Sequence, residues 1–134
     1  MARKSAAKAK ADPIAISEAE AVVMQVIWDR GPLPTEDVIA AVRHARWGES
    51  TVKTLLNRLL NKGALSAEKD NRRYVYSAQL TREEWLANES HGFLDRVFGG
   101  RVAPLVSYFS QQKKLHKDDI DELKRLIKEL DGGR

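Results

Sequence analysis

Residues 50–63 read STVKTLLNRLLNKG, and this stretch decides the fold. Val52 and the leucines recur at three- and four-residue spacing, which predicts a helix with one apolar face from Ser50 to about Lys62. Gly63 is typical of the residue that ends a helix. The opposite face carries hydroxyls, amides and long cations instead of the Glu/Lys mixture of an ordinary solvated helix. A helix divided in this way suits the major groove of B-DNA.

Two shorter helices are expected before this stretch. Ser17-Glu18-Ala19-Glu20 is a capping box that predicts a helix through Trp28, and Arg30-Gly31-Pro32 ends it. A second helix is expected with Thr35 as its N-cap, followed by a loop over residues 44–49.

After Gly63 the apolar period changes from helical to two. This change predicts strands over residues 65–69 and 73–77, with Asp70-Asn71-Arg72 suited to a hairpin tip. Three helices followed by such a hairpin form a winged helix-turn-helix.

The remainder of the chain is predicted to be helical. Thr81-Arg82-Glu83-Glu84 is a second capping box, and it opens a long helix that Gly99-Gly100 ends. Two more helices are expected, one beginning near Val102 and one over residues 117–130. The predicted fold class is therefore mainly α with a small β-wing.

Three segments are expected in the chain. Residues 1–13 form a basic tail predicted to be disordered, residues 14–79 a winged-helix DNA-binding domain, and residues 80–134 a helical dimerisation domain. The tail is either an inert extension or a weak phosphate-contacting arm, and the sequence does not decide between them.

The distribution of charge and the composition limit the classes of function that the chain can have. Residues 1–78 hold 13 Lys and Arg against 9 Asp and Glu, whereas residues 79–134 hold 10 against 10. The excess positive charge thus lies in the part expected to meet an anionic polymer. The chain has no cysteine, which excludes disulfides and thiolate metal sites. With no signal peptide and no membrane-spanning run, we expect a cytoplasmic protein without membrane insertion.

No enzyme motif is present. His44, His91 and His116 lie in three different predicted elements without metal-ligand spacing, and no nucleophile elbow, P-loop or dinucleotide fingerprint occurs. We therefore expect neither catalysis nor a cofactor nor a metal.

Double-stranded DNA is the expected partner of the 50–62 helix and the hairpin tip. Threonine and asparagine can contact base edges, lysine and arginine can contact phosphate or guanine, and cations on the wing would lie against the backbone or minor groove. The candidate DNA-contacting residues are Ser50, Thr51, Lys53, Thr54, Asn57, Arg58, Arg72 and Arg73. Each alone is also an ordinary surface residue, and a winged helix can instead serve as an adaptor for protein–protein contacts.

The C-terminal apolar stripe predicts a homodimer. About 55 residues in three helices form a marginal core alone, and a dimer doubles the DNA contacts across one helical turn. The alternative is packing of the stripe within its own monomer. The candidate interface residues are Val102, Leu105, Val106, Phe109, Ile120, Leu123, Leu126, Ile127 and Leu130.

Several of these motifs together resemble one known family. The run over residues 50–59, then Lys62-Gly63, then Arg73-Tyr74-Val75-Tyr76, is similar to the penicillinase and methicillin-resistance repressors of the BlaI/MecI/CopY family. The likeness covers nearly the whole chain after residue 14. It implies a dimer with N-terminal winged helices that represses resistance genes at inverted repeats related to TACA/TGTA. It also implies release by a membrane-bound sensor metalloprotease that cuts an Asn-Phe bond in the C-terminal domain.

Two departures from the family pattern matter. The position that matches the cleaved bond is Tyr108-Phe109, which puts the protease specificity, or proteolytic induction itself, in doubt. The absence of cysteine separates the chain from copper-responsive members, which carry a C-terminal Cys cluster.

Overall fold

The computed structural model describes residues 13–132, so the predicted basic tail lies outside the described residues except for its last position. The fold is mainly helical with one small antiparallel sheet, which confirms the predicted class. In chain order the elements are α2 (Glu18–Arg30), β1 (Leu33–Pro34), α3 (Thr35–Ala41), the 3-10 helix η1 (Arg43–Ala45), α4 (Glu49–Lys62), β2 (Leu65–Asp70), β3 (Arg73–Ala78), α5 (Arg82–Phe98), α6 (Val102–Gln111) and α7 (Lys117–Gly132).

Contacts within the chain divide it into two compact units, one ending at Asn88 and the next beginning at Glu89. The predicted boundary between residues 79 and 80 stays a prediction, because compactness alone does not establish which segments fold independently.

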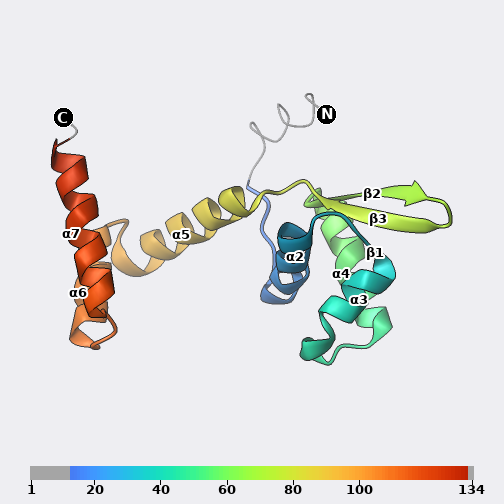
Figure 1. Cartoon of the computed structure of the whole chain (residues 1–134), viewed down its shortest axis with the longest axis horizontal. Helices are drawn as coiled ribbons and strands as arrows, with labels where there is room; N and C mark the ends of the chain where they lie inside the picture. The colour runs from blue at the N-terminus through green and yellow to red at the C-terminus, as the bar shows by residue number, and fades with distance from the viewer. Residues whose placement is uncertain (1–12, 133–134) are drawn as a thin grey trace. The chain divides into compact units, whose positions relative to one another are not determined.

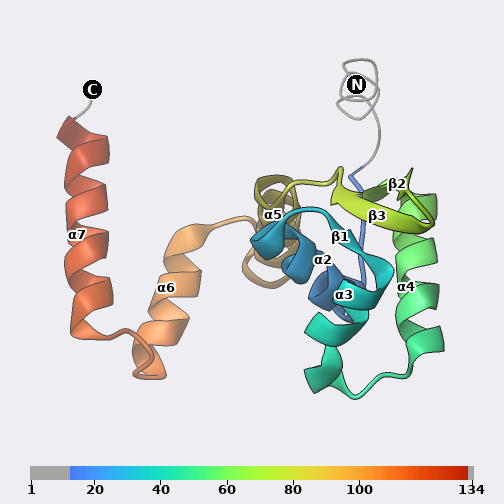
Figure 2. The same cartoon turned by 45° about the vertical axis from the view of Figure 1, so that its right-hand side comes forward.

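The first unit is a winged helix. Its sheet has the order β1-β3-β2, with Leu33 opposite Tyr76 and Asp70 opposite Arg73. In Figures 1 and 2 the helices α2, α3 and α4 lie below the β2–β3 hairpin, and Figure 1 shows the hairpin extending beyond them as the wing.

The core of this unit lies where the three helices meet the base of the hairpin. Its buried apolar residues are Val23, Met24, Ile27, Val38, Val42, Val52, Leu55, Leu56, Leu59, Ala64, Leu65, Tyr76 and Leu80. Tyr74 lies two residues before Tyr76 on the same strand but is exposed, because it stands farther out on the wing. The apolar period of α4 thus fixes the helix against the core along the face that the sequence predicts.

The helix starts follow the predicted capping with one correction. Ser17 and Glu20 form the expected capping box of α2, and Thr81 and Glu84 exchange the same two hydrogen bonds at the start of α5. The prediction that Thr35 is an N-cap is wrong, because Pro34 occupies the cap and Thr35 is the first residue of α3. Pro34 is held in extended geometry by its pairing with β3, so the helix begins directly after it.

Residues at the start of α5 pack on α2 and complete the first unit. The indole of Trp28 donates a hydrogen bond to the carbonyl of Leu80 at 2.8 Å, and its ring lies 5.4 Å from that of Trp85. The Arg82 guanidinium lies over the Trp28 ring and pairs with Asp29. The first turns of α5 are therefore fastened to the winged helix.

The second unit consists of the rest of α5 with α6 and α7. A chain of ring contacts joins Phe93 to Phe98, Phe98 to Tyr108, and Tyr108 to Phe109. None of the residues from Glu89 to Gly132 is buried. In this single chain the second unit therefore has apolar side chains but no closed core. Across residues 13–132, no helix has the length and apolar character needed to cross a bilayer.

Candidate nucleic-acid interface

Helix α4 presents the predicted reading face to solvent. Its buried side is formed by Val52 and the leucines at 55, 56 and 59. The six residues predicted to contact DNA from this helix, Ser50, Thr51, Lys53, Thr54, Asn57 and Arg58, are all exposed. The helix begins at Glu49, one residue earlier than predicted, with Gly48 as its cap. The polar side chains that can meet base edges thus stand together on the side away from the core.

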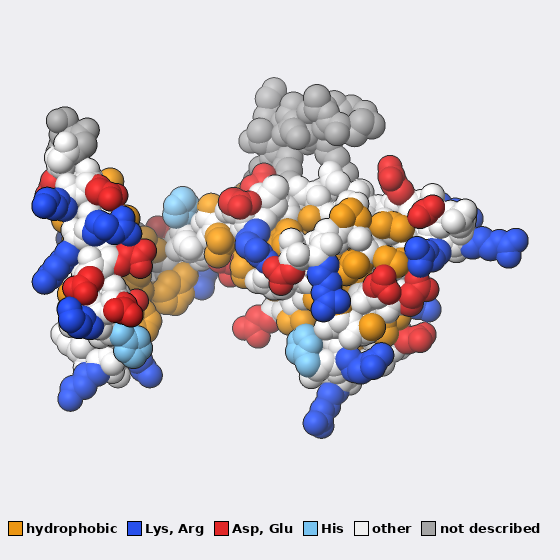
Figure 3. Space-filling model, viewed as in Figure 1, with side chains coloured by type: hydrophobic (Ala, Val, Ile, Leu, Met, Phe, Trp, Pro, Cys, Tyr) orange, Lys and Arg blue, Asp and Glu red, His pale blue; other side chains and the backbone are white. Residues whose placement is uncertain are grey.

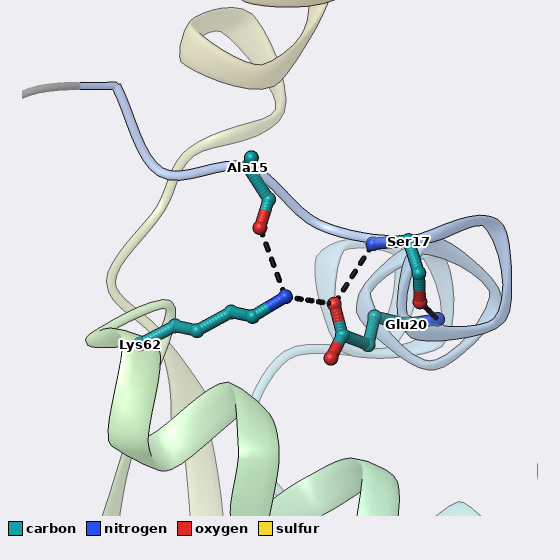
Figure 4. Close-up of polar contacts among 4 residues, drawn as sticks. All are labelled: Ala15, Ser17, Glu20 and Lys62. Atoms are coloured by element: carbon teal, nitrogen blue, oxygen red, sulfur yellow. Dashed lines mark hydrogen bonds and ion pairs between the residues drawn. The ribbon is translucent and has the colours of Figure 1, made fainter.

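The C-terminal end of α4 is tied to the start of α2 (Figure 4). Nζ of Lys62 lies 2.5 Å from Oε1 of Glu20 and donates a second hydrogen bond to the carbonyl of Ala15 at 3.0 Å. Gly63 then ends the helix in left-handed geometry, at φ 82°. Lys62 therefore positions the reading helix and is not a candidate for DNA contact.

The carboxyl group of Glu20 is ionised in this arrangement. Burial alone would raise its pKa, but the hydrogen bonds from Lys62 and Ser17 and the charge of Lys62 outweigh burial and lower the pKa. The same oxygen, Oε1, accepts from Lys62 and from the backbone N–H of Ser17 at 2.8 Å. One buried carboxylate thus serves both the cap of α2 and the docking of α4.

The wing places the two predicted arginines at its tip. The turn between β2 and β3 consists of Asn71 and Arg72, and Asn71 has a φ of 60° that asparagine tolerates better than most residues. Arg72 and Arg73 are exposed, and Nη1 of Arg73 lies 3.3 Å from Oε1 of Glu36 in α3. This ion pair joins the wing to the helix that precedes the reading helix.

A groove with a volume of about 320 Å³ lies between the wing and the starts of α3 and α4. It brings together three predicted residues, Lys53, Arg72 and Arg73. Sequence reasoning missed the others that line it, which are Thr35, Glu36, Ile39, Glu49 and Tyr74. The sequence does not predict that these residues meet, because they belong to three elements that only the fold brings together.

Further cations lie directly before α4. Arg43 belongs to η1 and Arg46 follows it with a φ of 61°, and both side chains are exposed. Neither has an ion pair within the described part of the chain. Figure 3 shows Lys and Arg side chains around η1 and at the far end of the wing. The available sequence signal is the pair of arginines within four residues of each other, where only a loop over residues 44–49, which includes Arg46, is predicted.

The second unit carries the predicted dimer residues on open surfaces. A pocket of about 300 Å³ between α6 and α7 is lined by Leu105, Val106, Phe109, Leu115, Asp119, Glu122, Leu123 and Leu126. Of the remaining candidates, Val102, Ile120, Ile127 and Leu130 are 40–72% exposed. An apolar surface of this kind on a helical unit without a closed core is typical of an interface.

The Tyr108–Phe109 bond lies in the last turns of α6. Both side chains are exposed, at 49% and 37%. The carbonyl of Tyr108 accepts from the N–H of Gln112 at 3.1 Å, and that of Phe109 accepts from Lys114 at 2.9 Å. A protease can reach this bond only after these hydrogen bonds open.

Comparison with known proteins gives one consistent result. The penicillinase repressor family model matches residues 16–129. The penicillinase repressor of Bacillus licheniformis is 34% identical over 115 residues, which cover 85% of this chain and 90% of that protein. The methicillin resistance regulatory protein MecI of Mammaliicoccus sciuri is 30% identical over 84% of this chain and 92% of its own. The solution structure of the DNA-binding domain of the repressor BlaI is 35% identical over 55% of this chain and 90% of that domain, with a TM-score of 0.51.

Proposed function

Because this chain belongs to the penicillinase repressor family, we propose that it binds an inverted-repeat operator as a homodimer and represses beta-lactamase or other resistance or stress genes. The family consists of DNA-binding transcriptional repressors and not of enzymes. Since its proposed partner is double-stranded DNA, the protein acts in the cytoplasm.

One observation carries the proposal: all eight predicted DNA-contacting side chains are exposed on one helix and one hairpin tip. In the proposed complex α4 enters the major groove. Thr51, Thr54 and Asn57 face base edges there, while Lys53 and Arg58 hold phosphate or guanine. Arg72 and Arg73 lie against the backbone or the minor groove and fix the position of the protein without reading sequence.

Two exposed cations extend this footprint. Arg43 and Arg46 stand directly before α4 without carboxylate partners in the described residues, so they are available to phosphates that flank the major groove.

The exposed apolar side chains of the second unit support the proposed dimer. Two copies that bury the apolar side chains of α6 and α7 against each other would give this unit the core that one copy lacks. A two-fold dimer also matches the symmetry of an inverted repeat.

Release from DNA is proposed to follow cleavage at Tyr108–Phe109 by a membrane-bound sensor metalloprotease. A cut there would separate α7 from the rest of the chain and so remove much of the proposed dimer surface. Co-expression with the protease encoded nearest this gene should yield a fragment ending at Tyr108. If the chain stays intact while its target genes are induced, release has another cause.

The proposal as a whole is tested by selecting duplexes from a random pool with the full-length chain. We expect enrichment of an inverted repeat, a dimer in light scattering, and an affinity that falls steeply with salt. A protein that enriches no sequence and shows no salt-dependent binding would instead be an adaptor for protein contacts.

A further inference from the structure

Two of the cations in the groove beside the wing form ion pairs with carboxylates. Nζ of Lys53 lies 3.8 Å from Oε1 of Glu49, one helical turn earlier on α4, and Arg73 pairs with Glu36 at 3.3 Å. In the part of the chain that the structure describes, only Arg72 among the three groove cations has no such partner. The groove therefore offers an incoming phosphate much less positive charge than its three cations suggest.

Stability does not explain these pairs. All four side chains are more than half exposed, and exposed ion pairs contribute little to folding because solvent and salt screen them. Their effect falls instead on whatever anion approaches the groove. A carboxylate that stays within a Debye length of a phosphate repels it, and it also competes for the cation.

We propose that Glu36 and Glu49 suppress non-specific DNA binding by occupying Arg73 and Lys53 until a cognate site displaces them. The inference rests on the proposed function, and it assigns the two glutamates a role in specificity. Binding to random DNA depends almost wholly on cations that neutralise phosphates, so paired cations weaken it. At a cognate site the base contacts of α4 draw the duplex into close fit, and phosphates then replace the carboxylates on both cations.

The test compares the wild type with a Glu36→Gln plus Glu49→Gln variant on two probes. One probe is the duplex that the wild-type chain selects from a random pool, and the other is a scrambled duplex of equal composition. Asp37→Asn is the matched control for lost charge, since Asp37 is an exposed neighbour on α3 that neither lines the groove nor holds an ion pair in the described residues.

We expect the double variant to bind the scrambled duplex about tenfold more tightly at low salt. The plot of log affinity against log salt should steepen by about one to two units, because two more cations can neutralise phosphates. Affinity for the selected duplex should rise less, so the ratio between the two probes falls. Each single variant should show part of the effect, and thermal unfolding should be unchanged because the pairs are exposed.

Three results would overturn the inference. These are an unchanged affinity for the scrambled duplex, an equal gain on both probes, or an effect of Asp37→Asn as large as that of the double variant. If the wild type itself selects no duplex, the proposed function fails first and this inference fails with it. If the wild type selects an inverted repeat but the double variant keeps the same ratio of affinities for the selected and scrambled duplexes, this inference is refuted while the proposed function stands.

Discussion

Lys62 at the end of α4 pairs with Glu20 in the first turn of α2, although 42 residues separate them in sequence. Glu20 is buried while Lys62 is partly exposed. We expect Lys62→Met to lower the free energy of unfolding by about 2 kcal/mol, because it leaves a buried carboxylate without its cation. This value lies below the range for fully buried pairs, since solvent still reaches the lysine. Urea unfolding near neutral pH measures the change.

Lys69→Met is the matched control for that substitution. Lys69 is exposed on β2 and has no ion pair in the described residues, so its loss should change the free energy of unfolding by less than about 0.5 kcal/mol. Equal effects of the two substitutions would mean that the Lys62–Glu20 pair does not hold α4 in place.

The same pair predicts a pH dependence of stability. The pKa of Glu20 in the folded protein lies below its ordinary value of 4.5, so the unfolded state binds the proton more readily. The stability that Glu20 contributes is therefore present above about pH 4.5 and is lost as the pH falls through the lower folded pKa. Urea unfolding of wild type and Glu20→Gln at decreasing pH should show the difference between them shrinking. A constant difference would assign the effect of the substitution to packing.

Removing two cations from the reading face tests the role of α4. Lys53→Ala plus Arg58→Ala should weaken binding to the selected duplex and reduce the salt slope by about two units, since up to two phosphate contacts are lost. The oligomeric state should not change. Gel shift and light scattering measure the two properties. Lys128→Ala in α7, which removes an exposed lysine of the second unit, should bind DNA normally; unaltered binding by the double variant would refute the assignment of α4.

Truncation tests where the two halves of the chain divide. A fragment ending at Asn88 keeps Trp85 on Trp28 and should be a folded monomer. A fragment ending at Leu80 loses this ring contact and should be about 1–3 kcal/mol less stable. Circular dichroism and light scattering distinguish these outcomes. A dimeric fragment ending at Asn88 would show that the second unit is not needed for dimerisation.

Gly92 in α5 offers a site for stabilisation. A Cβ at this position would meet only the end of the Arg96 side chain, at 3.4 Å. Gly92→Ala should therefore add about 1 kcal/mol, because alanine favours the helix over glycine. Gly100→Ala is the opposite control, since Gly100 has a φ of 81° and its added Cβ would lie 3.2 Å from Asp95. Thermal unfolding of the full chain should move upward for the first substitution and downward for the second.

Local patterns in the sequence predicted most of the fold. The capping boxes that begin at Ser17 and Thr81 each lie within four consecutive residues and mark the starts of α2 and α5. The apolar period of α4 identifies its buried face from the sequence of that helix alone. The exposure of Lys53 and Arg58 follows from that same period. These features depend only on residues that are close together in sequence, so the sequence alone is enough to predict them.

The groove beside the wing and the Lys62–Glu20 contact between α4 and α2 could not be predicted in this way. Glu36 lies in the first turn of α3, where an acidic side chain favours the helix dipole, and nothing near it in sequence points to Arg73. The capping box predicts a role for Glu20 at the start of α2, but its burial beneath Lys62 depends on how α2 and α4 pack. Pairings of this kind arise only when elements distant in sequence are brought together.

The contact between Trp28 and Trp85 also means that the intrinsic fluorescence of the chain can report on its conformation. The three tryptophans all lie in the first unit: Trp28 and Trp85 contact each other, and Trp47 directly precedes the cap of α4 in sequence. Events at the reading helix should therefore change the fluorescence of Trp47, while loosening of α5 should change that of Trp28 and Trp85, whose rings are in contact. A variant with phenylalanine at Trp28 and Trp85 would report operator binding through Trp47. A variant with phenylalanine at Trp47 would report opening of α5 through Trp28 and Trp85, without an attached dye.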